Sequence, residues 1–112
     1  MTTAHRPIRL RSLSPERRSL VALCQSLPFG RLENLRVAGG EPILDPPPRI
    51  VREVKLGGEN DPRPELAQGD FVLKSQLVDL FFEFDKLGDG NILVLEVKHG
   101  LPFRMLIGAS IA

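Results

Sequence analysis

Acid–base chemistry in this 112-residue chain would have to use the carboxylates of one segment, residues 57–70. This segment, GGENDPRPELAQGD, contains three glycines and two prolines and is the longest stretch without a helix or strand pattern. Loops of this length are uncommon in small domains unless they are functional or mobile. The sequence therefore predicts a candidate loop site, whose residues are Asn60, Asp61, Arg63 and Glu65. Solvated surface charges are the alternative interpretation.

A calcium site is the second chemistry that the spacing of carboxylates suggests. Asp85, Asp89 and Glu96 fall on positions one, five and twelve of a calcium-binding loop. Calcium needs about six to eight oxygen ligands, however, and positions three and nine are occupied by Leu87 and Leu93. The residues that follow also favour an extended hairpin instead of a second helix. We therefore expect neither a metal site nor a cofactor.

Nucleophilic catalysis lacks the pair of residues that it needs. The single cysteine, Cys24, lies on the apolar stripe of a predicted helix and is expected to be a small buried core residue. The two histidines, His5 and His99, lie in the N-terminal arm and in a predicted turn. No serine or cysteine has a plausible histidine partner, so the sequence predicts a protein that is not an enzyme.

The composition is typical of soluble proteins with a single domain. The hydrophobic fraction is 42% and the charged fraction is 26%, both close to globular averages. No apolar run is long enough to span a bilayer, and the start of the chain lacks the apolar segment of a secretory signal. We therefore expect a cytoplasmic protein without membrane contacts.

Positive charge is concentrated at the N-terminus. The first 18 residues contain five arginines and one glutamate, whereas the rest of the chain has a small excess of acidic residues. Residues 1–13 are predicted to form a basic flexible arm, and its candidate phosphate contacts are Arg6, Arg9 and Arg11. A solvated terminus is the alternative.

Two amphipathic helices are expected from capping residues and apolar spacing. The first should run from its N-cap, Ser14, to about Leu27. The second should follow its N-cap, Asp70, and run from about Phe71 to Leu87. Its apolar residues cover more than half of its circumference, which is more than one sheet face buries. The surplus residues form a candidate interaction surface of Phe71, Val78 and Phe82, which the loop, the first helix or another subunit would cover.

Two β-hairpins and one further strand complete the predicted elements. The hairpins span residues 33–44 and 92–107, with Gly39-Gly40 and His99-Gly100 in their turns. The further strand, residues 49–56, follows a run of prolines that cannot continue a ladder. Alternation predicts two apolar strand faces, one of Ile50, Val54 and Leu56 and the other of Leu101, Phe103, Met105 and Ile107.

The two hairpins match at an offset of 60 residues. The identities are Gly30 with Gly90, Leu35 with Leu95, Val37 with Val97, Gly40 with Gly100 and Pro42 with Pro102. One helix and one hairpin could not bury their own apolar faces, whereas two copies could share a core. We therefore expect a single α+β domain, residues 14–112, with two helix–β-hairpin repeats that share a mostly antiparallel sheet of four to five strands and two helices. Repeat one would span about 14–56, the acidic loop 57–70 and repeat two about 70–107.

The first predicted copy has a short pattern of its own: a helix, then FGRL at residues 29–32, then LxVxxG at residues 35–40. This pattern resembles a group of small uncharacterised bacterial proteins that consist of one helix followed by an aromatic-Gly-led β-hairpin. The resemblance covers about residues 16–44 and, less clearly, 76–106, where Asp89 replaces the aromatic residue. It implies the fold, and it implies no particular activity.

Protein interaction is the function that these features favour most. The surplus apolar surface, the long acidic loop and the lack of a catalytic set of residues predict a small non-enzymatic protein-interaction module. Its partner would be a second copy of itself or another protein. The alternative is a nucleic-acid-binding protein that uses the N-terminal arginine arm.

Overall fold

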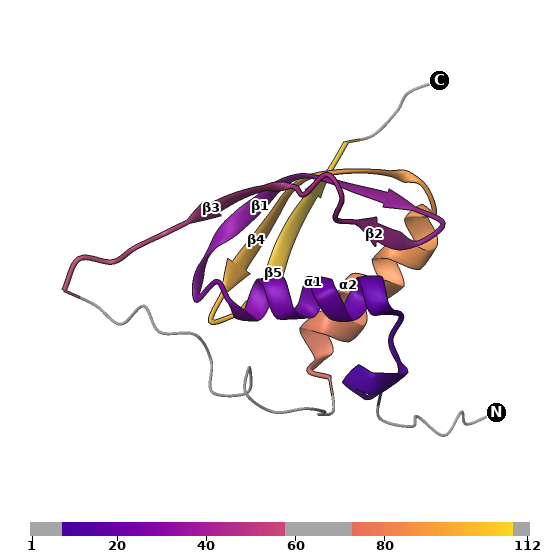
Figure 1. Cartoon of the computed structure of the whole chain (residues 1–112), viewed down its shortest axis with the longest axis horizontal. Coiled ribbons are helices and arrows are strands. Elements are labelled where there is room, and N and C mark those ends of the chain that lie inside the picture. Colours follow the sequence, from indigo (N-terminus) through magenta and orange to yellow (C-terminus); the bar gives the residue numbers. More distant parts are fainter. Residues whose placement is uncertain (1–7, 58–72, 109–112) are drawn as a thin grey trace.

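The computed structural model describes residues 8–57 and 73–108, which form two α-helices and a five-stranded sheet (Figure 1). In chain order, the elements are the 3-10 turn η1 (Leu10–Ser12), α1 (Pro15–Gln25), β1 (Phe29–Ala38), β2 (Glu41–Ile43), β3 (Arg49–Arg52), α2 (Ser75–Leu87), β4 (Gly90–Lys98) and β5 (Leu101–Ile107). The sheet is antiparallel, so the predicted α+β class is confirmed.

The two longest strands, β1 and β4, pair with each other in the middle of the sheet. The other edge of β1 pairs with β3 over residues 30–33 and with β2 over residues 36–38. The other edge of β4 pairs with β5. Strand β5 therefore lies at the edge of the sheet, and none of the described residues forms a strand on its outer side.

Pairs between β1 and β4 recur when each residue is exchanged for the residue 60 positions away in the sequence. Gly30 pairs with Val97, and the residues 60 positions away from them, Gly90 and Val37, pair with each other. The two α-helices begin at Pro15 and Ser75, which are also 60 residues apart. These positions agree with two copies related by a two-fold axis between β1 and β4, although the duplication itself stays a prediction.

Both predicted hairpin turns are confirmed by their backbone angles. Gly39 and Gly40 have φ angles of 58° and 77°, and His99 and Gly100 have φ angles of 55° and 73°. A two-residue hairpin loop needs positive φ angles, which glycine adopts readily and most other residues avoid. The two turns end the strands at the positions that the sequence predicts.

Helix α1 begins as predicted. The side chain of Ser14 accepts a hydrogen bond from the backbone N–H of Arg17, and Pro15 occupies the first helical position. The helix ends at Gln25, two residues before the predicted end, because the backbone N–H of Leu27 bonds to the carbonyl of Cys24 in a tighter turn.

The core lies between the sheet and the two helices, which cover the same face of the sheet (Figure 1). Its largest side chains with almost no exposed surface are Leu20 of α1, Leu32 and Leu35 of β1, Leu77 and Phe84 of α2, and Ile92 and Leu95 of β4. Neither helix of the described residues is long and apolar enough to cross a membrane.

The predicted start of the second helix is wrong. Helix α2 begins at Ser75, four residues after the predicted Phe71, and its N-cap is Lys74, whose side chain makes no capping hydrogen bond. The reason lies in a long-range contact: the backbone N–H of Leu73 donates to the carbonyl of Ile8 at 2.7 Å. The backbone of Lys74 is extended, with a ψ angle of 158°, so Leu73 lies outside the helix. The proposed cap, Asp70, lies outside the described residues.

The predicted strand faces need two corrections. Strand β3 ends at Arg52, and Ile50, Val54 and Leu56 are all exposed, since neither helix covers this corner of the sheet. In β5, a register shift lies between the pairs Glu96–Arg104 and Val97–Pro102, so Phe103 is an extra residue. The shift buries Pro102 and exposes Phe103, which breaks the predicted alternation.

Candidate functional site

Helix α2 carries the most exposed phenylalanine of the described residues. The side chain of Phe82 is 60% exposed, whereas Phe81 and Phe84 are buried. Val78, one turn earlier in the helix, is half-buried. Val78 and Phe82 line the same groove, so the structure brings together two residues of the predicted interaction surface. The third, Phe71, lies outside the described residues.

This apolar groove, which we call the Phe82 groove, has a volume of about 420 Å³. Helix α2 forms one side of it, and the segment before α1 together with the residue before the N-cap of α2 forms the other. Its apolar lining residues are Ile8, Leu13, Leu73, Val78, Phe81 and Phe82. The backbone hydrogen bond between Leu73 and Ile8 holds the two chain segments together at this place.

Arg17 of α1 connects the groove to the rest of the fold. Its guanidinium donates to the backbone carbonyl of Gly40 at 2.9 Å and to the carboxylate of Asp85 at 2.5 Å. The same guanidinium lies 5.0 Å from the ring centroid of Phe81 and 3.7 Å from the carboxylate of Glu41. One half-buried cation thus joins α1, the β1–β2 turn and α2.

Replacing Arg17 with methionine is expected to lower the free energy of unfolding by about 2 kcal/mol, because the buried Gly40 carbonyl loses its charged donor. Methionine keeps the apolar part of the arginine side chain in place. Arg18→Met is the matched control, since the neighbouring arginine is exposed, and it should change stability by less than about 0.5 kcal/mol. Urea unfolding of both variants measures the difference, and equal effects would contradict the role of Arg17.

The exposed side of α2 has charges at both ends of its apolar centre. Asp79 lies one turn before Phe82 and makes no hydrogen bond or ion pair with the described residues. Lys86 lies one turn after Phe82, with its ammonium 5.5 Å from the ring centroid and 3.4 Å from the carboxylate of Glu83. This side of the helix therefore has a negative end, an aromatic centre and a positive end.

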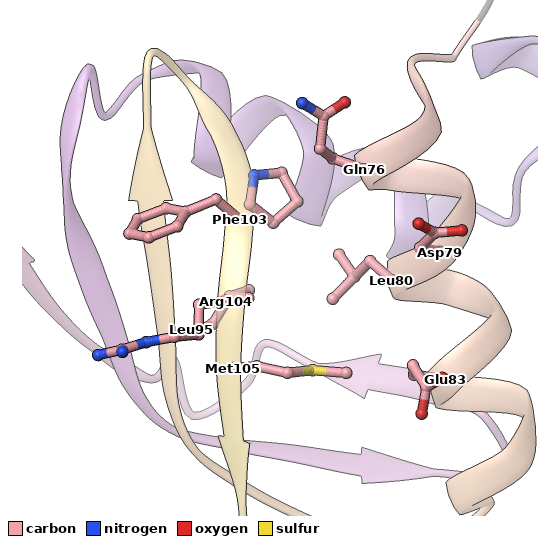
Figure 2. A pocket seen from close by; sticks show the side chains of 9 residues that line it. Gln76, Asp79, Leu80, Glu83, Leu95, Phe103, Arg104 and Met105 are labelled. Atoms are coloured by element: carbon pink, nitrogen blue, oxygen red, sulfur yellow. The ribbon is translucent and has the colours of Figure 1, made fainter.

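A second, smaller groove separates α2 from strand β5 (Figure 2). We call it the β5 groove; its volume is about 160 Å³. Leu80 and Met105 point into it from the helix and from the strand, and Gln76, Asp79 and Glu83 follow its helical rim. Asp79 thus borders both grooves of α2.

The other predicted site residues are not brought to these grooves by the part of the chain that is described. Asn60, Asp61, Arg63 and Glu65 of the candidate loop site lie outside residues 8–57 and 73–108, and so does Arg6. Arg9 and Arg11 flank or belong to η1, and each already makes an interaction within the protein. The hypothesis that the arginine arm binds nucleic acid stays a prediction.

Cys24 and Glu33 are titratable groups whose pKa is shifted by their surroundings. Complete burial raises the pKa of the Cys24 thiol from 9.0 to about 12, so that the thiol stays protonated at neutral pH. The hydrogen bond from Arg31 lowers the pKa of the Glu33 carboxylate on the exposed face of the sheet. Within the two described ranges, no three His, Cys, Asp or Glu side chains form a group that could hold a metal ion.

Sequence reasoning missed the β5 groove and the part that Asp79 plays on α2. The seven-residue spacing of Asp79 and Lys86 is visible in the sequence, and it places both charges on one side of a helix with Phe82 between them. The β5 groove has no comparable signal, because it depends on where the edge strand packs. Comparisons of the chain with protein-family models, curated proteins and solved structures find no match.

Proposed function

We propose that this protein is a non-enzymatic protein-interaction module that associates with a second copy of itself through the exposed side of α2. The observation that carries the proposal is the exposure of Phe82 directly beside an apolar groove. Burying a phenylalanine side chain contributes about 1.5–3 kcal/mol, and an exposed aromatic residue next to an apolar groove is typical of an interface centre.

The charges of α2 favour a second copy in an antiparallel orientation. Asp79 and Lys86 lie about two helical turns apart on either side of Phe82. If two α2 helices pack antiparallel across a two-fold axis near Phe82, each Asp79 faces the Lys86 of the other copy. A parallel arrangement would place like charges opposite each other, which is unfavourable.

The Phe82 groove also suits an arrangement with two-fold symmetry. It lies directly beside the exposed ring, since Phe82 itself is one of its lining residues. In a two-fold pair, the ring of each copy can therefore cover the groove of the other copy. Both exposed apolar features of this surface, the ring and the groove, would be buried by a single contact.

Phe82→Glu tests the proposal. We expect this substitution to weaken self-association by at least about thirtyfold, which corresponds to the loss of about 2 kcal/mol at an interface centre. Sedimentation equilibrium over a range of protein concentrations measures the effect. The matched control is Phe103→Glu on β5, where the phenylalanine is similarly exposed but does not line the Phe82 groove, and its dimerisation should equal that of the wild type. A wild-type protein that stays monomeric would overturn the proposal.

A charge exchange tests the antiparallel orientation separately. Asp79→Lys and Lys86→Asp should each weaken the dimer by about three- to tenfold, because each creates two like-charge contacts across the two-fold axis. The double variant should recover most of the lost affinity, since the new lysine at position 79 would then face the new aspartate at position 86 of the other copy. If the double variant dimerises more weakly than both single variants, the antiparallel arrangement is wrong.

A further inference from the structure

Strand β5 is an edge of the sheet that the described residues leave open. Its inner side pairs with β4 from Leu101 to Ile107, and no described strand pairs with its outer side. An open edge presents unpaired backbone N–H and C=O groups to any extended chain. Pro102 has no N–H and Phe103 is bulged, so residues 104–107 are the part of β5 that has neither a proline nor an extra residue; the second register shift, opposite Leu106 and Ile107, has its extra residue on β4.

The opposite edge of the sheet is much less suited to strand addition. It is divided between β2, with three residues, and β3, with four residues. The segment between these strands contains three consecutive prolines, which donate no backbone hydrogen bonds. Short strands and prolines are common ways in which proteins block their sheet edges. Residues 104–107 lack these features and expose Leu106 and Ile107.

The β5 groove would receive the side chains of an added strand. Side chains of a strand point alternately to the two faces of the sheet, so every second side chain of a chain paired with β5 would point towards α2. Leu80 and Met105 give the groove an apolar floor (Figure 2). An apolar side chain of the added strand would fill the space between them.

The charges along the groove distinguish between possible occupants. Its rim carries Asp79 and Glu83, and it is lined by one basic residue, Arg104, which pairs with Glu96 on the face of the sheet away from the helices. Two copies of this chain paired from β5 to β5 would bring together the sides of α2 that carry Asp79 and Glu83, which is unfavourable, whereas the dimer proposed above places Asp79 of each copy opposite Lys86 of the other. Lys86 already pairs with Glu83, so a lysine or arginine of an extended peptide would neutralise the remaining negative charge of the rim, at Asp79.

We propose that residues 104–107 of β5 bind an extended peptide segment of a partner protein by strand addition, with apolar and basic side chains of that segment facing α2. Hydrogen bonds between the backbones of β5 and the peptide would provide affinity. The apolar and basic side chains at every second position of the peptide, which face α2, would provide specificity. This inference deepens the proposed interaction function, but it uses a different surface, and Phe82 is not among the residues that line the β5 groove.

The test is a selection of displayed random heptapeptides on the immobilised full-length protein, followed by fluorescence anisotropy with the enriched peptides. We expect enriched peptides in which apolar and Lys or Arg residues recur at every second position. Replacing the basic residue with glutamate, or methylating the backbone nitrogens that pair with β5, should weaken binding at least tenfold. Glu83→Lys should weaken binding of the same peptides by a similar factor, and a selection on this variant should prefer acidic peptides.

Phe82→Glu separates the two proposals, because this variant should lose self-association and still bind the enriched peptides. No enrichment over a surface without protein would overturn strand addition at β5, and so would peptides without a two-residue period. Binding that tolerates backbone methylation would overturn it as well. None of these outcomes bears on dimerisation, which is measured in the absence of peptide.

Discussion

Replacing Phe84 with alanine is expected to lower the free energy of unfolding by about 3–5 kcal/mol, the usual cost of deleting a fully buried aromatic ring. Phe84 has no exposed surface and packs edge-on against Phe81, with the ring centroids 5.7 Å apart. The ring fills the centre of the interface between α2 and the sheet, so its loss leaves a cavity that the rigid strands cannot close. Urea unfolding at a fixed protein concentration measures the change.

Phe82→Ala is the matched control on the same helix. The Phe82 ring is mostly exposed, so this substitution should change the unfolding free energy of the monomer by less than about 0.5 kcal/mol. The comparison must be made at a concentration where the protein is monomeric, because self-association would add its own stabilisation. If both variants lose the same unfolding free energy, then α2 does not turn Phe84 towards the core and Phe82 towards solvent.

The sequence predicts the parts of this fold that depend on neighbouring residues. The cap at Ser14 and the two hairpin turns are confirmed because each is decided by local backbone chemistry. The buried side of α2 is also predictable, since residues three and four positions apart share one side of any helix. The α+β class follows from the order of these local elements.

The errors arise where a distant segment decides the local structure. Leu73 fits the apolar spacing of the second helix, but its N–H bonds to Ile8, which is 65 positions earlier in the chain. Ile50, Val54 and Leu56 fit the alternation of a buried strand, yet the helices do not reach this corner of the sheet. A local sequence pattern indicates neither the hydrogen bond between Leu73 and Ile8 nor which part of the sheet the helices cover.

The candidate site could be predicted only in part, because some of its residues lie on one helix and others come from distant segments of the chain. The surplus apolar residues Val78 and Phe82 follow from helical spacing within one element, and the structure places both beside one groove. The rest of that groove comes from Ile8, Leu13 and Leu73, which only the folded chain brings together. The β5 groove likewise requires the order of the strands in the sheet, which the sequence leaves open.

Under the two proposals, helix α2 would take part in two separate interactions. Phe82 is mostly exposed and does not line the β5 groove, whereas Leu80 and Glu83 do. Asp79 is the residue that borders both surfaces. If both proposals hold, Asp79 couples them, because an ion pair with one partner reduces the negative charge available to the other.

Gly30→Ala is expected to have the second large effect on stability, a loss of about 3 kcal/mol, because the added methyl group overlaps the backbone of a neighbouring strand. A Cβ atom at residue 30 would lie 2.2 Å from the carbonyl oxygen of Val51 in β3, far inside van der Waals contact. The backbone of residue 30 fixes the position of its Cβ atom, and the Val51 oxygen belongs to the backbone, so no side-chain rotation relieves the overlap. The Gly30–Arg52 pair of the β1–β3 ladder would have to open.

Gly39→Ala distinguishes this overlap from the general cost of losing a glycine. Gly39 has a φ angle of 58° in the first hairpin turn, and apart from its two chain neighbours no described residue lies within 4 Å of the position of its Cβ. Alanine there should cost about 1 kcal/mol through backbone strain alone, with unchanged amide exchange in β3. In Gly30→Ala, by contrast, the amides of residues 51 and 53, which face β1, should lose their protection against hydrogen exchange; the Glu53 N–H bonds to the carbonyl of Phe29. Retained protection at these amides would show that the β1–β3 ladder stays closed around the added methyl group, and the predicted overlap would then be wrong.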